Sequence, residues 1–187
     1  ETVELVLRLN IDSKQSTQNV RGSFSLPHGI GRTVRVIAFA EGDDAQKAAQ
    51  AGAVEVGSAD LVKKILDGWT DFDVAVAHPQ MMKHVGRLGK VLGPQGKMPS
   101  PKNGTVTDDV VTAVAEFTAG KIEFRNDAGG NVHAVVGKQS FDKKKLVENI
   151  EAFVAHIKRA KPSSAKGTYI KKACLSATMS PGVEMTI

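Results

Sequence analysis

The stretch Val34-Arg35-Val36-Ile37-Ala38-Phe39-Ala40 decides the fold, because the pattern of the chain changes there. Six of its seven residues are apolar, as expected of a strand that is covered on both faces. Before it, residues 2–11 and 20–26 alternate between apolar and polar side chains, which is typical of strands with one wet face. The stretch therefore marks the start of a domain whose layers differ from those of the domain that begins the chain.

The residues after this stretch alternate between helix and strand patterns. The sequence predicts a helix near 44–51, a strand at 53–56, a helix after Ser58 that ends at Gly68, a strand at 72–77, a helix opened by Pro79, and a helix from 107 to 117. This alternation indicates a small three-layer α/β domain with a parallel sheet, similar to a Rossmann fold.

The antiparallel pattern returns after Gly120. Strands are predicted at 121–125 and 132–136, joined by the hairpin signal of residues 126–130, and they are followed by a helix at 142–159 and a final strand at 168–179. The turn-forming residues 12–14 also predict that the strands at 2–11 and 20–26 pair with each other.

We therefore expect one domain inserted into another. Residues 1–28 and 121–187 form an α+β terminal domain, with an antiparallel sheet plus a helix, and residues 29–120 form the inserted α/β domain. The chain crosses twice between the two domains, so Gly29, Gly31 and Gly120 are predicted to form a double-stranded hinge.

The charge divides unevenly between these predicted domains. The whole chain of 187 residues has a net charge of +5. The terminal domain has 15 Lys and Arg against 9 Asp and Glu, a net of +6, whereas the insert has 10 against 11, a net of −1. Three of the lysines, at 143–145, open a predicted helix, where cations oppose the helix dipole. An anionic partner of the terminal domain explains this distribution, and an ordinary solvated face is the alternative.

Other features exclude several classes of function. The single cysteine, Cys174, excludes an internal disulfide and a zinc site made of cysteines, and no apolar run is long enough to span a bilayer. The five histidines lack metal-ligand spacing, and the glycines at 86–96 follow a helix where a dinucleotide motif would follow a strand. We predict no catalytic residue, metal or cofactor. A small enzyme that uses the strand ends of the insert is the alternative, and it requires a polar pocket there.

Two features are candidates for binding. The loop 93–106 has a backbone path restricted by glycines and prolines and carries Lys97 and Lys102, so it is either a rigid connector or a contact surface. The polar face of the first strand can align with the last strand to present Thr2, Glu4, Arg8, Ser176, Thr178 and Met179. Such hydroxyls, carboxylates and cations suit RNA, and an aromatic content of 5% favours recognition of shape and backbone over base stacking. An ordinary solvent-facing sheet is the alternative.

Segments spread over nearly the whole chain resemble the large-subunit ribosomal protein of the L-one family, the protein of the mobile stalk beside the tRNA exit site. The matching segments are residues 1–4, 18–22, 26–29, 34–36, 65–68, 71–73, 92–106, 122–127, 133–138, 166–168 and 178–181. The inserted-domain architecture of that family agrees with the organisation expected above.

The resemblance implies a monomer within the ribosome, in the cytoplasm of a bacterium or in an organelle, with no membrane partner. It implies that the terminal domain binds the large-subunit rRNA stalk, that the insert contacts exit-site tRNA through Lys97 and Lys102 and assists its release, and that a free copy represses its own mRNA by binding the leader. Carried over by position, the rRNA-binding residues are Thr2, Glu4, Arg8, Arg125, His133, Lys138, Gly167, Thr168, Ser176, Thr178 and Met179.

The chain departs from the family pattern in the loop 93–106, where Gln95, Lys97 and Ser100 replace the commoner Arg, Leu and Asn, and at two further places. The family usually has glycine where this chain has Ser180, and a side chain there would weaken RNA contact if the position required a close approach of the backbone or a positive φ. The family also has an N-terminal segment with further RNA contacts before Thr2, so we expect residues to precede Glu1.

Overall fold

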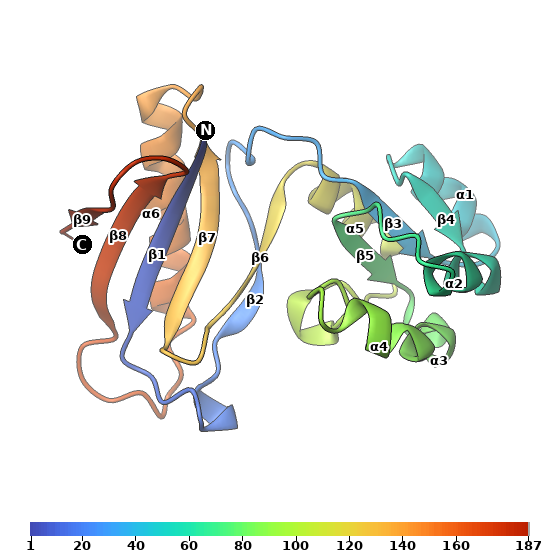
Figure 1. The fold of residues 1–187 in the computed structure, drawn as a ribbon, viewed down its shortest axis with the longest axis horizontal. Helices are drawn as coiled ribbons and strands as arrows, with labels where there is room; N and C mark the ends of the chain where they lie inside the picture. The colour runs from blue at the N-terminus through green and yellow to red at the C-terminus, as the bar shows by residue number, and fades with distance from the viewer. Residues whose placement is uncertain (187) are drawn as a thin grey trace. The chain divides into compact units, whose positions relative to one another are not determined.

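The computed structural model describes residues 1–186, and the chain forms two compact units (Figure 1). Unit 1 consists of residues 1–32 together with the chain from Lys121 onward, and unit 2 is Thr33–Gly120. Both units mix sheets with helices, as the sequence predicts. Among the helices of residues 1–186, none has the length and apolar character that crossing a bilayer requires.

Unit 1 contains a four-stranded antiparallel sheet in the order β7-β1-β8-β9. The strands are β1 (Thr2–Leu9), β7 (Asn131–Lys138), β8 (Ile170–Ala177) and β9 (Val183–Met185). The long helix α6 (Lys143–Arg159) lies behind this sheet in Figure 1. Leu5 and Leu7 of β1 are fully buried, as are Phe153 and Ile157 of α6. Apolar residues recur at every second position of the strand and about every 3.6 positions of the helix, so these side chains lie on the facing sides of the two elements and form one core.

A second, two-stranded sheet pairs β2 (Arg21–Ser25) with β6 (Lys121–Arg125). Phe124 of β6 meets Phe153 of α6 edge to face, with ring centroids 5.5 Å apart, and Phe24 of β2 lies 6.1 Å from the same ring. The aromatic contacts therefore attach this small sheet to α6.

Two predicted strand pairings in this unit are wrong. β2 pairs with β6 and not with β1, because both edges of β1 are occupied by β7 and β8. β6 and β7 share only the isolated bridge between Asn126 and Val132, so residues 126–130 turn the chain from one sheet into the other. The final strand was also predicted too long: β8 ends at Ala177, and the chain folds back as β9, which was not predicted.

Unit 2 has a parallel sheet in the order β4-β3-β5, as the apolar stretch 34–40 predicts. Its strands are β3 (Val36–Phe39), β4 (Glu55–Gly57) and β5 (Val74–Ala77), and its longer helices are α1 (Asp43–Gln50), α2 (Ala59–Leu66) and α5 (Val110–Thr118). All four residues of β3 are buried. Pro79 opens a helical segment as expected, and this segment consists of short 3₁₀- and α-helices: η2 (Pro79–Met81), α3 (Met82–Val85), η3 (Gly86–Leu88) and α4 (Gly89–Leu92).

The glycines at the crossings between the units have positive φ angles of 63° at Gly29, 73° at Gly31 and 107° at Gly120. A Cβ on Gly31 would lie 2.5 Å from the ring of Phe141, so only glycine fits there without a shift of that ring. Their role as a hinge stays a prediction.

Asn149 of α6 is the fully buried polar residue that joins three segments of unit 1. Its Nδ2 donates to the carbonyl of Val136 in β7 at 2.9 Å and to the carbonyl of Gly29 at 3.1 Å. Its Oδ1 accepts from the backbone N–H of His28 at 3.1 Å. One amide thus fixes β7 and the segment that leaves unit 1 to the same point on α6.

Replacing Asn149 by alanine should lower the free energy of unfolding by about 2–4 kcal/mol, because it leaves buried backbone groups without partners. Urea denaturation followed by far-UV circular dichroism measures this loss. Glu151→Gln, at an exposed position of the same helix, is the matched control and should stay within about 0.5 kcal/mol of the parent. Equal stabilities of the Asn149 variant and the control would contradict the role given to the amide.

Candidate nucleic-acid interface

The sheet face turned away from α6, called here the wet face, is built from residues that pair side by side across three strands. Directly paired residues of neighbouring strands point to the same side of a sheet. The rows across β7, β1 and β8 are Val135–Glu4–Ser176, His133–Val6–Cys174 and Asn131–Arg8–Lys172. Glu4, Arg8, His133 and Lys172 are exposed, whereas Val6, Val135 and Cys174 of the same rows are partly buried, so the exposed positions of this face are polar.

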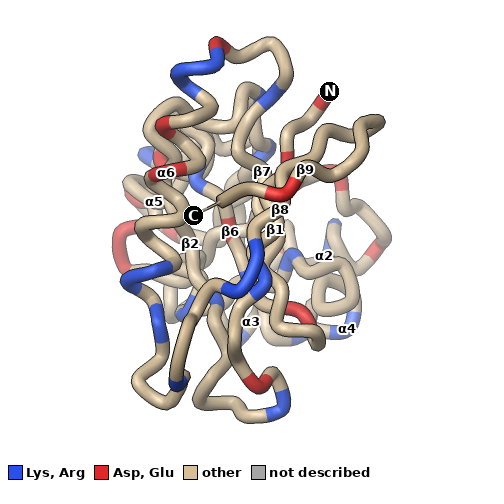
Figure 2. Tube along the Cα trace, turned by 90° about the vertical axis from the view of Figure 1, so that its left-hand side faces the viewer, with Lys and Arg blue, Asp and Glu red and all other residues tan. Residues whose placement is uncertain are grey.

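The end of the wet face beside Arg8 is basic. Lys172 donates to the carboxylate of Glu184 in β9 at 2.9 Å, and this hydrogen bond raises the pKa of Lys172. Arg8 has no ion-pair partner within residues 1–186, so its charge is available to an anion. Figure 2 marks Lys and Arg positions on the trace beside β1 and β8. Divided at the observed unit boundary, unit 1 has 16 Lys and Arg against 9 Asp and Glu, a net of +7.

At the opposite end, Thr2 and Thr178 hold the strands β1 and β8 together. The backbone N–H of Thr2 donates to Oγ1 of Thr178 at 3.1 Å, and the backbone N–H of Thr178 donates to the carbonyl of Thr2 at 3.2 Å. Met179 follows directly and is 84% exposed. The Thr178 hydroxyl therefore already has a structural role, whereas Met179 is presented to solvent.

Ser180 fits its position without backbone strain. Within residues 1–186, no residue other than glycine has a positive φ. The Ser180 hydroxyl accepts from the backbone N–H of Ala177 at 2.8 Å and thereby closes the turn after β8. The hydroxyl thus stabilises this turn, and the effect of Ser180 on RNA contact stays a prediction.

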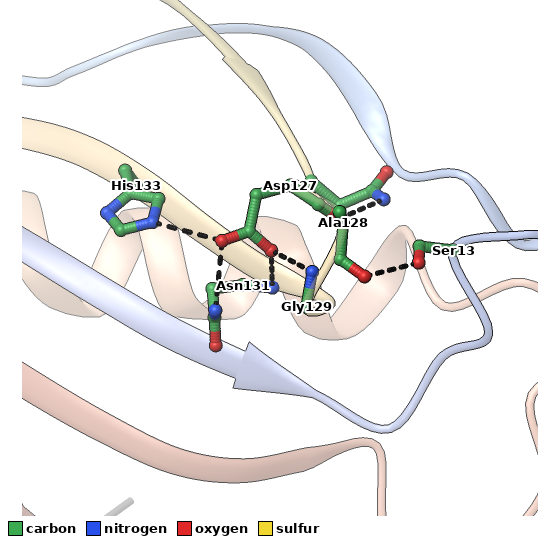
Figure 3. Close-up of polar contacts among 7 residues, drawn as sticks. Ser13, Asp127, Ala128, Gly129, Asn131 and His133 are labelled. Carbon is green, nitrogen blue, oxygen red and sulfur yellow. Dashed lines mark hydrogen bonds and ion pairs between the residues drawn. The ribbon is translucent and has the colours of Figure 1, made fainter.

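Asp127 organises the turn that leads into β7 (Figure 3). Its carboxylate accepts from the side-chain amide of Asn131 at 3.0 Å, from the backbone N–H of Asn131 at 2.7 Å and from that of Gly129 at 2.8 Å. His133 lies 3.6 Å from the same carboxylate. These hydrogen bonds, those of Asn131 first, lower the pKa of Asp127 to about 2. The turn thus holds Asn131, at the start of β7, in place.

The remaining predicted residues divide between this face and its surroundings. Lys138 pairs with Thr2 at the hydroxyl end, and Gly167 and Thr168 lie in the loop before β8, beside Asn10, whose Nδ2 donates to the carbonyl of Lys166 at 3.1 Å. Arg125 lies outside this sheet, in β6, directly opposite Arg21 of β2.

Sequence reasoning missed several residues that the structure adds. Lys172, Asn131 and Glu184 belong to the wet face or its edge, and Arg21 stands beside Arg125. The period of 2 offered a signal for Lys172, since it lies four positions before Ser176 on the same face. Arg21 was hidden by the wrong pairing of β2.

In unit 2, the loop 93–106 is held both by contacts with residues outside it and by contacts among its own residues. Nζ of Lys97 donates to the carbonyl of Thr70 at 3.0 Å and lies 5.0 Å from the centre of the Phe72 ring. The buried Thr105 accepts the backbone N–H of Ser100 at 2.9 Å. Lys102 is exposed, so of the two lysines it is the one that the loop presents to solvent.

No group of three or more His, Cys, Asp or Glu residues within residues 1–186 is arranged to hold a metal ion. One cavity lies beside α6 and β8 of unit 1, lined by Lys158, Lys161, Thr168, Tyr169 and Ile170.

The chain is similar to known proteins over nearly its whole length. The model of the Ribosomal protein L1p/L10e family matches residues 1–181. The chain is 55% identical to the large ribosomal subunit protein uL1 of Micrococcus luteus over 184 residues. This alignment covers 98% of the chain and 78% of the relative. The uL1 protein of Thermosipho melanesiensis is 53% identical, over 99% of this chain and 80% of the relative.

These matches define the class first: the chain is a structural, non-enzymatic protein of the large ribosomal subunit. It belongs to the Ribosomal protein L1p/L10e family. In bacteria, this family lies in the cytoplasm as part of the ribosome.

The low pKa of Asp127 predicts a stability that depends on pH. Its folded pKa of about 2 is below the value of about 4 in an unfolded chain, so its stabilisation is complete above pH 4 and is lost as the pH falls toward 2. The difference in unfolding free energy between the parent and Asp127→Ala should therefore shrink between about pH 4 and pH 2. Urea denaturation at several pH values measures this, with Glu151→Ala as the exposed control. A difference that is constant with pH would refute the assignment.

Proposed function

We propose that the protein binds the rRNA stalk of the large subunit through the wet face of unit 1. The observation that carries the proposal is the arrangement of polar side chains across the paired strands of that face. Thr2 and Thr178 lie at one end, and Arg8 and Lys172 lie at the other. Hydroxyls and carboxylates bond 2′-OH groups and base edges, and cations bind phosphates. The net charge of +7 in unit 1 supports the same assignment.

The pair Arg21 and Arg125 extends the proposed contact beyond the wet face. Like charges directly opposite each other in a sheet are destabilising. Neither side chain has an ion-pair partner within residues 1–186, and both are exposed. A phosphate of the bound RNA would remove their repulsion, so we include both residues in the rRNA site.

The proposal also covers the other two RNA partners of the resemblance. Lys102 is the residue of unit 2 that contacts exit-site tRNA during its release, whereas Lys97 supports the loop from inside. A free copy represses its own mRNA by binding a leader of similar shape through the same wet face. Both proposals rest on the resemblance, and the rRNA proposal does not depend on them.

Changes at Thr178 and Met179 should separate recognition from stability. Met179→Ala should weaken binding of a stalk rRNA fragment by about 1–3 kcal/mol and leave the unfolding free energy unchanged, because the side chain is 84% exposed. Thr178→Val should weaken both binding and folding, since its hydroxyl also bonds Thr2. Thr178→Ser keeps the hydroxyl and is the matched control. Filter binding or calorimetry measures the affinities, and full affinity of the Met179 variant would remove this residue from the site.

RNA binding should depend less steeply on salt concentration when an arginine without an ion-pair partner is replaced. Arg8→Gln and Arg125→Gln should each lower the slope of log K against log salt concentration by about 1, because each loses one phosphate contact. Lys47→Gln, an exposed change of the same charge in unit 2, should leave the slope as it is. Slopes that are equal in all variants would place the phosphate contacts elsewhere.

A further inference from the structure

The turn between β8 and β9 holds Met179 in a fixed and exposed position. On one side of it, the backbone N–H of Thr178 donates to the carbonyl of Thr2 at 3.2 Å. On the other, the backbone N–H of Ser180 donates to the carbonyl of Ala177 at 3.1 Å. The Met179 side chain between these two residues is 84% exposed, more than any other large apolar side chain of residues 1–186. Its sulfur is therefore open to a small reactant in solution.

The other methionines of the chain are less accessible. All five methionines lie within residues 1–186. Met81 is buried, and Met82 and Met98 pack partly buried against the core of unit 2. Met185 of β9 is partly buried as well. Because an oxidant reaches an exposed thioether more readily than a covered one, Met179 should be oxidised before the other four.

Cys174 is the other sulfur on the wet face, and the chain covers part of it. It is partly buried, and a Cβ on Gly182 would lie 2.8 Å from its Sγ. The two oxidised sulfurs are also chemically distinct. Thiol reagents reverse a cysteine sulfenic acid or disulfide, whereas methionine sulfoxide requires a methionine sulfoxide reductase. An effect at Met179 can therefore be separated from an effect at Cys174.

The place of Met179 makes its oxidation state relevant to the proposed rRNA site. It follows Thr178 at the end of the wet face where Thr178 is bonded to Thr2. Oxidation converts the flexible apolar thioether into a polar and chiral sulfoxide. The new oxygen is an acceptor with partial negative charge, so phosphates repel it and it cannot donate to the acceptors of the RNA. Since the side chain is exposed and lies outside the core, the fold should not change.

We propose that Met179 is an oxidation site through which a hydroperoxide weakens the binding of RNA to the wet face. The thioether sulfur attacks one oxygen of the peroxide, so an S–O bond forms and the O–O bond breaks. The sulfur is oxidised by two electrons and the peroxide is reduced by two. The departing oxygen takes the proton of the transferred one and leaves as water or an alcohol.

The same chemistry makes the modification reversible. A methionine sulfoxide reductase returns the sulfur to the thioether with two thiols, which become a disulfide, and the oxygen leaves as water. The inference rests on the proposed rRNA binding and adds the regulation of that site.

The test treats the full chain with hydrogen peroxide and follows it by peptide mass spectrometry. The added oxygen should appear on Met179 before it appears on the other methionines. The affinity for a stalk rRNA fragment, measured by filter binding, should then fall about five-fold or more, while the melting temperature stays the same. Methionine sulfoxide reductase with dithiothreitol should restore the affinity, whereas dithiothreitol alone should not.

Two variants are the matched controls. Met179→Leu lacks the sulfur, so its affinity, at whatever level it starts, should be equal before and after peroxide. Met185→Leu removes a partly buried methionine and keeps Met179, so it should respond to peroxide as the parent does.

Several results would overturn the inference: oxidation of Met179 no faster than that of Met82 or Met185, an equal loss of affinity in Met179→Leu, or recovery with dithiothreitol alone, which would assign the effect to Cys174. If the untreated parent binds the fragment and keeps its affinity after Met179 is oxidised, this inference fails and the proposed function stands. If the untreated parent does not bind the fragment, the proposed function fails, and the inference fails with it.

Discussion

The buried amide of Asn149 is the constraint on which unit 1 depends. Val3 pairs with Gly137 and Glu4 with Val135, so Val136 bulges out of the ladder between β1 and β7. The carbonyl of Val136 accepts a hydrogen bond from Nδ2 of Asn149 at 2.9 Å. Without this partner the bulge would bury an unpaired carbonyl, which is costly in a protein interior. The register at the start of β1 therefore depends on a helix residue.

That bulge also determines which side chains reach the wet face. In a strict alternation from Val132, Lys138 would point into the core. The extra residue restores Lys138 to the side of Thr2, with which it pairs. The same amide accepts the N–H of His28 and donates to Gly29, so the edge of the binding face and the first crossing toward unit 2 are fixed at one point of α6.

The local pattern of apolar and polar residues predicted much of this fold, because it reflects which side chains are buried. The apolar stretch of β3 and the alternation of β1 depend only on which faces are covered, and both strands lie close to their expected positions. Pairing partners depend on the competition among all strands, so β2 was assigned to the wrong neighbour. β9 has only three residues, too few for a period, and its presence follows from the turn that Ser180 closes.

The same distinction applies to the candidate site. The alternation of β1 placed Thr2, Glu4 and Arg8 together, since position on a face follows from period alone. The period of the sequence could not show whether a side chain is free to contact a partner. Lys97 looks in sequence like a free cation of an exposed loop, yet it is bonded to the carbonyl of Thr70. Such tertiary contacts join residues 27 positions apart, beyond the reach of any local pattern.

The fixed geometry of the wet face bears on how it can recognise RNA. Binding through mobile side chains loses affinity to their ordering, whereas a surface held in advance avoids that cost. Here both ends are held: Thr178 closes one through its hydroxyl, and Asp127 closes the other through three hydrogen bonds to the turn before β7. A duplex or folded loop offers its 2′-OH groups and phosphates in a fixed array, which a rigid sheet can match without aromatic stacking. The scarcity of aromatic side chains on this face is therefore compatible with specific binding, because shape replaces stacking as the means of selection.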